Sequence, residues 1–369
     1  MFLINRKDMD TMKIPKSRVQ LHLHLEGSVR LTTIWELSQR KGIKLTPNET
    51  FEELRNHYIM KKPESLEVCL NLIAEYYRII VGDVEAIERI AYELCEDQFL
   101  QNVLYFEVRM NPQYSSNTVE ENPLARGQVV DVNHPNALTP KQVVETVLKG
   151  LKRGEQDFGV HSSLILSCIT IFNEWNEDIL DLAQEFRDKG VVGIDIAGPE
   201  SMDPENSHTF NEKTVELFRK AKELNIHRTV HAGEVGPACN VAFAVDKLFA
   251  ERIGHGYNGV LDDEVYRKCQ LANIHFEICP VSSYLAAGVS LSVKHPVVKL
   301  AEDLANFSIN SDDPTVFGNT LDDDYLFVSK MGLNEFHLVR ANINALKSSF
   351  LPENRKLELL QYIYKLFGL

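Results

Sequence analysis

The most constraining feature of this 369-residue chain is a regular alternation between short apolar runs and longer stretches with helical periodicity. The short runs are rich in β-branched and aliphatic residues, which is typical of strands buried on both faces. Eight such runs occur, at residues 19–24, 103–109, 164–169, 191–197, 228–231, 252–255, 275–279 and 307–310. Between them, apolar residues recur at spacings of three and four, as at 84–100, 142–150, 176–189, 211–224, 241–249 and 261–271. The alternation predicts parallel βαβ units, and eight units predict an α/β fold closed into a (β/α)8 barrel.

Polar residues at the ends of these runs favour a closed barrel over an open sheet. Nearly every predicted strand ends in a side chain that could take part in chemistry, and in a barrel these ends meet at one mouth. An open doubly wound sheet would spread them along a line and would usually carry a glycine-rich phosphate turn, yet no G-x-G-x-x-G follows any predicted strand. We therefore expect a TIM-type barrel that forms a single domain over residues 17–369, after an N-terminal tail at 1–16.

The segment between the first two predicted strands, residues 25–102, must hold additional helices. Within it, one apolar stripe with helical spacing is expected to pack in the core, from where it could also wall the mouth: Leu66, Cys69, Leu70, Ile73 and Tyr77. Residues 113–140 are polar and rich in Pro and Asn, which predicts an exposed loop.

Charge and hydropathy exclude several classes of protein. The chain has 39 Lys and Arg against 53 Asp and Glu, a net charge of −14, which argues against a nucleic-acid binder. No run approaches the roughly 20 apolar residues that span a bilayer. The first four residues are apolar and charges follow directly, so we expect no secretory signal. Six cysteines with irregular spacing and no C-x-x-C are interpreted as buried free thiols, and the favoured location is the cytosol.

The pair His22 and His24 is the first candidate for chemistry. Residues two apart on a strand point to the same side, so both imidazoles would project into the barrel mouth. Their neighbours Leu21, Leu23 and Leu25 are apolar, which makes the two histidines polar exceptions in a buried run. Buried polar groups need partners, and histidine is the commonest metal ligand.

Three more strand ends add to this pair. His231 ends a strand and Glu234 opens the loop after it, while His255 stands between two glycines. Asp312 and Asp313 follow the last strand; a turn or helix cap would explain one of them but less readily both. A set of three histidines and one aspartate from strands one, five and eight suits zinc with an open position for water: His22, His24, His231 and Asp312. The sequence therefore predicts one zinc ion at the mouth.

Several motifs, taken in order, resemble the adenosine deaminase family. They are His22-Leu23-His24-Leu25-Glu26-Gly27-Ser28, His231-Ala232-Gly233-Glu234, Gly254-His255-Gly256-Tyr257 and Ser311-Asp312-Asp313-Pro314, with further likeness at 276–280 and 342–350. The resemblance runs from about Val19 to the C-terminus. It implies zinc-dependent hydrolytic deamination of adenosine and 2'-deoxyadenosine to inosine and 2'-deoxyinosine plus ammonia, a reaction of purine salvage.

The resemblance also implies individual roles. The zinc ligands would be the four residues named above. His255 would orient the attacking water or take its proton, and Glu234 would protonate purine N1, which requires a carboxyl that burial keeps protonated. Asp313 would share a hydrogen bond with purine N7, and the backbone N–H of Gly198 would reach N3.

Two positions depart from the family pattern. Glu26 replaces the aspartate that usually faces the ribose hydroxyl, and Thr170 stands where the family often shows arginine. Glutamate at position 26 occurs in relatives that act on free adenine or on modified nucleotides. It keeps adenine or N6-modified adenylate deaminase open as the alternative to adenosine deaminase.

Other functions are less well supported. A two-metal amidohydrolase would need a lysine on the fourth strand, and 191–197 has none. A polynucleotide deaminase would carry H-x-E…P-C-x-x-C, which is absent. A non-catalytic growth-factor-like relative would carry a signal sequence and an added N-terminal domain, and neither is visible. The expected partner is a small purine nucleoside, without nucleic acid or membrane, while protein partners and oligomeric state stay open.

The remaining candidates are given supporting roles or none. Arg109, at the end of the second strand, is interpreted as a salt-bridge partner that organises the mouth. Glu277 is expected to support a ligand histidine from behind. The other eight histidines need no role: His57, His134, His161, His208, His227, His275, His295 and His337.

Overall fold

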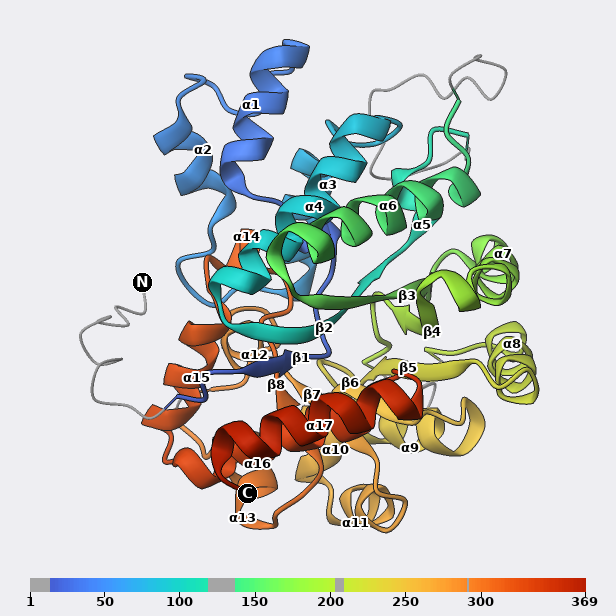
Figure 1. The fold of residues 1–369 in the computed structure, drawn as a ribbon, viewed down its shortest axis with the longest axis vertical. Coiled ribbons are helices and arrows are strands. Elements are labelled where there is room, and N and C mark those ends of the chain that lie inside the picture. The colour runs from blue at the N-terminus through green and yellow to red at the C-terminus, as the bar shows by residue number, and fades with distance from the viewer. Residues whose placement is uncertain (1–13, 119–136, 203–208, 291) are drawn as a thin grey trace.

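A computed structural model of the protein describes residues 14–118, 137–202, 209–290 and 292–369 (Figure 1). Its centre is a sheet of eight strands that pair in sequence order, each with the next and all in parallel. The strands are β1 (Arg18–Gln20), β2 (Val103–Met110), β3 (His161–Ile169), β4 (Val191–Ala197), β5 (His227–Ala232), β6 (Arg252–His255), β7 (His275–Ile278) and β8 (Phe307–Ile309). Helices surround this ring, so the predicted single-domain TIM-type barrel is confirmed.

The connections between strands supply the helices. Four of them lie between β1 and β2, as predicted for that segment: α1 (Leu31–Lys41), α2 (Phe51–Tyr58), α3 (Leu66–Tyr77) and α4 (Val84–Leu100). The others are α5 (Pro112–Ser115), α6 (Pro140–Phe158), α7 (Asn173–Glu185), α8 (Glu212–Glu223), α9 (Ala238–Lys247), α10 (Tyr257–Leu261), α11 (Asp263–Leu271), α12 (Pro280–Leu285), α13 (Pro296–Glu302), α14 (Pro314–Phe317), α15 (Leu321–Lys330), α16 (Glu335–Ser348) and α17 (Glu353–Phe367), with short 3-10 turns at Glu26–Ser28 and Arg187–Lys189. None of the described helices combines the length and apolar character needed to cross a membrane.

Side chains complete the junction between the first and last strands. The backbone N–H of Leu21 and that of His22 donate to Oδ1 of Asn310, at 2.8 and 3.2 Å. Beyond this point, His24 N donates to Asp312 O and Asp312 N donates to His22 O, at 3.2 and 3.3 Å. The regular part of β1 therefore ends at Gln20, earlier than the predicted 19–24, because the Asn310 amide takes the place of a ladder partner.

The end of the barrel opposite the mouth is covered by the last two helices. Leu359, Leu360 and Ile363 of α17 pack with Val19 of β1 and Tyr105 of β2. In Figure 1, α17 crosses the molecule close to these strands. Apolar burial at this end leaves the other end, where the strands terminate, as the accessible one.

The expectation of an exposed loop at 113–140 is wrong for its first residues. Asn111 accepts a hydrogen bond from the backbone N–H of Tyr114 at 3.0 Å, and Pro112 occupies the first helical position, so the chain forms the short helix α5. Gln113 and Ser115 are buried in it. Residues 119–136 lie outside the described part of the chain, as do residues 1–13, so the tail boundary at residue 16 stays a prediction.

Candidate active site

Four side chains from distant parts of the sequence meet at the mouth of the barrel. His22 and His24 follow β1, His231 lies near the end of β5, and Asp312 follows β8. Oδ1 of Asp312 lies 3.3 Å from Nε2 of His22 and 3.4 Å from Nε2 of His24. Nε2 of His24 lies 3.2 Å from Nε2 of His231. The structure thus brings together the four residues that the sequence predicted as zinc ligands.

Unusual backbone geometry shapes this cluster. Asp312 and His255 have φ values of +65° and +64°, a region that non-glycine residues rarely occupy and that often marks a functional site. A Cβ atom at Gly254 would lie 3.0 Å from Cε1 of His22 and 3.3 Å from Cγ of His231. Glycine at position 254 therefore gives the two imidazole rings the space to approach β6.

The cluster has the donor chemistry of a transition-metal site. Nε2 of His22 is buried without a hydrogen bond, although it faces Asp312 and the other imidazoles. The nitrogens of His22, His24 and His231 lie within 4.8 Å of one another. Burial lowers the pKa of His24 well below its usual range, so this imidazole is neutral, as a metal ligand must be. Imidazole and carboxylate donors at the end of a barrel fit a bound metal.

A second possible donor set includes a cysteine. His22, His255, Cys279 and Asp312 also have donor atoms within 4.8 Å. Burial raises the pKa of the Cys279 thiol well above its usual range, and nearby Asp312 raises it further. A protonated thiol is a poor ligand, so the set of three histidines and Asp312 fits a metal better.

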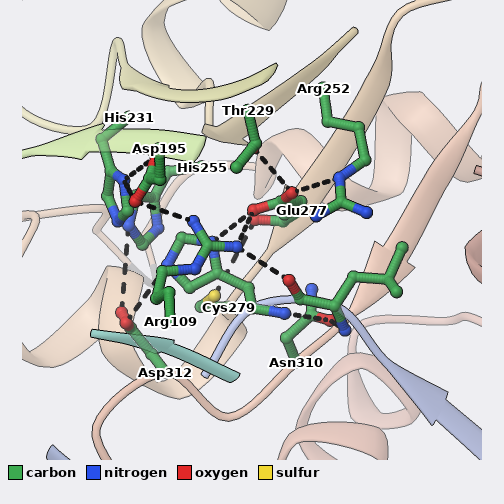
Figure 2. Close-up of polar contacts among 12 residues, drawn as sticks. Arg109, Asp195, Thr229, His231, Arg252, His255, Glu277, Cys279, Asn310 and Asp312 are labelled. Atoms are coloured by element: carbon green, nitrogen blue, oxygen red, sulfur yellow. Dashed lines mark hydrogen bonds and ion pairs between the residues drawn. The ribbon is translucent and has the colours of Figure 1, made fainter. Parts of the chain in front are cut away.

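A buried network of charged side chains contacts two of the three clustered histidines (Figure 2). Nδ1 of His22 donates to Glu277 at 2.7 Å, and Nδ1 of His231 lies 3.0 Å from a carboxylate oxygen of Asp195. Arg109 bridges the two carboxylates, with distances of 2.6 Å to Glu277 and 3.3 Å to Asp195. Fixing the Nδ1–H in this way turns each Nε2 lone pair toward the mouth. The contacts predicted for Arg109 and Glu277 are present, whereas the contact of Asp195 with His231 was not foreseen.

A cavity of about 270 Å³ opens beside the histidine cluster. Its wall holds every other predicted site residue: Glu26, Gly198, Glu234, His255 and Asp313. Leu66, Leu70 and Ile73 of α3 line it as well, so the apolar stripe of that helix walls the mouth. Residues not singled out from the sequence complete the wall, among them Asn111, Tyr114 and Phe172. Asn111 directly follows β2, and that position was the signal that could have revealed it.

The acids of this cavity differ in protonation, because the neighbouring histidines hold the pKa of Asp312 well below its usual range, whereas the pKa values of Glu234 and Glu26 are raised. Burial raises the pKa of Glu234 well above its usual range, and the charges of Asp312 and Glu200 raise it further. Burial also raises the pKa of Glu26 to about 7, while a hydrogen bond from the Asn111 backbone opposes the shift. Nε2 of His255 lies 3.7 Å from Glu234, and burial lowers the pKa of this imidazole well below its usual range. A protonated carboxyl and a neutral imidazole therefore stand side by side, suited to proton transfer.

Fold and site together define an α/β barrel whose mouth combines a histidine and aspartate cluster that could hold a metal ion with buried titratable groups. A family model described as adenosine deaminase matches residues 15–366. An adenosine deaminase of Xenopus laevis is 42% identical over 363 residues, which cover 98% of either chain. This chain belongs to the adenosine deaminase family.

Solved structures of similar fold have related names. An adenine deaminase from Arthrobacter aurescens has a TM-score of 0.78 and 25% sequence identity, covering 97% of this chain and 100% of the other. An N6-mAMP deaminase from Arabidopsis has a TM-score of 0.74 and 27% identity, covering 95% of this chain and 97% of the other. These two names refer to substrates of different size.

Proposed function

We propose that this protein hydrolytically deaminates adenosine and 2'-deoxyadenosine, giving inosine and 2'-deoxyinosine plus ammonia. The observation that carries the proposal is the placement of buried Glu234 and His255 in a pocket beside the cluster of three histidines and Asp312. The match along nearly the whole chain to relatives named adenosine deaminase supports the same reaction.

The proposed metal is one zinc ion per chain, held by the four residues of the cluster. Zinc bound in such a site would lower the pKa of a coordinated water to about 7 and so would supply hydroxide at neutral pH. Glu234, kept protonated by burial, donates its proton to purine N1 and makes C6 more electrophilic. His255, neutral and 3.7 Å from Glu234, orients the attacking water or accepts its proton.

The proposed substrate contacts lie on the same wall. The backbone N–H of Gly198 donates to purine N3, and Asp313 shares a hydrogen bond with N7. Oδ1 of Asp313 is buried without a hydrogen-bond partner among the described residues, which supports a role in binding a ligand. Glu26 contributes to the recognition of the ribose.

The side chains that line the pocket favour a nucleoside over a nucleotide. No Lys or Arg lines this cavity in the described part of the chain, whereas Glu26, Asp312 and Asp313 do. A 5'-phosphate would enter without a Lys or Arg side chain among the described residues to bind it and would face carboxyl groups. This argues against the N6-modified adenylate substrate named for the Arabidopsis neighbour. Adenine remains the alternative, because Glu26 differs from the family's usual aspartate.

Ammonia release from adenosine, 2'-deoxyadenosine, adenine and AMP tests the proposal, each assayed with zinc-loaded protein of measured metal content. We expect the two nucleosides to have the highest kcat/KM. Preference for adenine or AMP would replace the proposed substrate, and absence of ammonia from all four would refute the activity. Glu234→Gln keeps size and shape and should lower kcat by about 10²- to 10⁴-fold with zinc content unchanged.

A further inference from the structure

Glu200 holds the loop that carries Glu234. It lies two residues after Gly198, in the connection that follows β4, while residues 233–236 follow β5. Its Oε1 accepts the backbone N–H of Gly233 at 2.7 Å. Its Oε2 accepts the backbone N–H groups of Glu234, Val235 and Gly236 at 2.9, 3.0 and 3.0 Å. Four successive N–H groups thus converge on one carboxylate.

The remaining contacts complete this arrangement. Nδ2 of Asn240, on α9, also donates to Oε1 of Glu200 at 3.0 Å. From the opposite side, Asn258 of α10 donates to the loop, from its backbone N–H to Gly233 O at 2.9 Å and from Nδ2 to Gly236 O at 2.7 Å. The loop is therefore fixed from both sides, and its position is tied to the connections after β4 and β6.

The sequence of the loop is adapted to this contact. A Cβ atom at Gly236 would lie 2.8 Å from Oε1 and 2.9 Å from Cβ of Glu200, closer than real Cβ contacts. Only glycine leaves room for the carboxylate against the backbone. The carboxylate of Glu200 therefore lies in the bend formed by successive backbone N–H groups, which is the usual form of a backbone anion site.

Glu200 has little remaining capacity for other chemistry. A carboxylate offers about four lone-pair positions, and the two oxygens of Glu200 already accept five hydrogen bonds. It is absent from the residues that line the cavity. Its effect on the substrate must therefore pass through the loop, and hydrogen bonds to a charged acceptor are the strong ones that can fix a loop.

We propose that Glu200 is the positioning residue for the proton donor: by binding the N–H groups of residues 233–236 it holds the Glu234 carboxyl at the substrate's ring N1. This inference rests on the proposed function. It also links two substrate contacts, because Glu200 and Gly198 belong to the same short segment after β4. Movement of that segment would displace the N3 donor and the N1 proton donor together.

The test compares Glu200→Gln, Glu200→Asp and the control Glu216→Gln, an exposed glutamate on α8. Glutamine keeps one acceptor oxygen and turns the other into an NH2 group that cannot accept, so at least two donors lose their partner. A misplacement of about 1 Å at a reacting group lowers rates by up to about 10²-fold. We expect Glu200→Gln to lower kcat for adenosine about 10- to 100-fold with KM changed far less. Glu200→Asp, which keeps both oxygens, should fall between it and the wild type, and Glu216→Gln should match the wild type.

Binding of two inhibitors separates positioning from general damage. Purine riboside carries ring N1, and its 1-deaza analogue has C–H there. The measured quantity is the ratio of the affinity for purine riboside to the affinity for the 1-deaza analogue. We expect Glu200→Gln to reduce this ratio at least 5-fold relative to the wild type, in samples of equal zinc content and folded fraction. An unchanged ratio, or unchanged kcat in Glu200→Gln, would overturn the role of Glu200. If the Gln variant does not fold, the ratio and kcat of the Asp variant decide in the same way. A wild-type protein without turnover would instead refute the proposed function.

Discussion

Two groups of buried carboxyls in this barrel have opposite protonation. Inside the barrel, Arg109 and Arg252 hold the pKa of Glu277 well below its usual range, and His231 and Arg109 do the same for Asp195. At the mouth, burial raises the pKa values of Glu26, Glu234 and Asp313, and for Asp313 the neighbouring charge of Asp312 adds to the effect.

Burial alone does not explain this difference. Glu277 and Asp195 are 0% exposed, while Glu26, Glu234 and Asp313 are 6–8% exposed, so the more deeply buried acids are the ionised ones. Cationic partners decide the outcome: Glu277 contacts Arg109 at 2.6 Å and Arg252 at 2.7 Å. The paired acids stabilise the barrel, and the unpaired acids at the mouth remain available to a ligand.

The largest expected effect comes from removing the cation that the interior acids share. Arg109→Met leaves Asp195 and Glu277 short of a partner in a fully buried site. Breaking such a pair costs about 3–5 kcal/mol, which we expect as the loss in the free energy of unfolding by urea at pH 7. Arg355→Met, which removes an exposed pair with Glu358, should change it little. A loss below about 1 kcal/mol for Arg109→Met would show that the interior carboxyls do not depend on this cation for stability. They would then not differ in this respect from the acids at the mouth.

The second prediction concerns pH and the neutral His275 at the start of β7. Its ring nitrogens lie 2.8 Å from Asn306 Oδ1 and 2.8 Å from Ser308 Oγ, and burial lowers its pKa from 6.5 to about 4. The unfolded chain binds a proton below pH ~6.5, whereas the folded chain does so only near pH 4. Stability supplied by this neutral ring is therefore present above pH 6.5 and lost as pH falls toward 4, by up to about 3 kcal/mol.

His275→Gln removes this titration. The difference in unfolding free energy between wild type and variant should shrink as pH falls from 7 to 4, measured by urea unfolding at each pH. A difference that stays constant over that range would show that His275 is not held neutral. It would also show that the barrel interior does not fix the protonation of its buried groups.

The third effect links the interior to the mouth. Glu277 accepts a hydrogen bond from Nδ1 of His22, and loss of such a contact usually weakens metal binding 10- to 100-fold. Glu277→Gln should therefore lower zinc affinity by about that factor, measured by competition with a chelator on folded protein. Glu251→Gln is the matched control, because Glu251 binds Nδ1 of His227, a histidine outside the cluster, at 2.8 Å. Equal zinc affinities in the two variants would show that the hydrogen bond between Glu277 and His22 does not support zinc binding.

The barrel and most of its mouth were predictable from local patterns. The alternation of apolar runs and amphipathic stretches gave eight strands, and α4 coincides with the predicted 84–100. The gathering of His22, His231 and Asp312 followed from their places at strand ends. The position of a residue along its strand can be predicted from the local sequence. In a parallel barrel, residues at the C-terminal ends of different strands lie close together.

What could not be predicted depends on contacts between distant side chains. The amide of Asn310 meets a backbone group 289 positions away, and this contact shortens β1. The ring of five hydrogen bonds around Glu200 arises only after β4 and β5 are placed side by side. The pairing of Asp195 with His231 likewise requires the barrel to be built. No spacing in the sequence encodes such partners.

The smallest expected effect concerns Glu26, one of the acids at the mouth of the barrel. Glu26 accepts the backbone N–H of Asn111 at 2.9 Å and takes part in no ion pair with the described residues. Glu26→Gln keeps an acceptor for that N–H and removes a carboxyl whose ionised form burial disfavours. The unfolding free energy at pH 7 should therefore stay within ~1 kcal/mol of the wild type or rise, while KM for adenosine changes. A loss as large as that of Arg109→Met would place Glu26 among the acids that hold the barrel together.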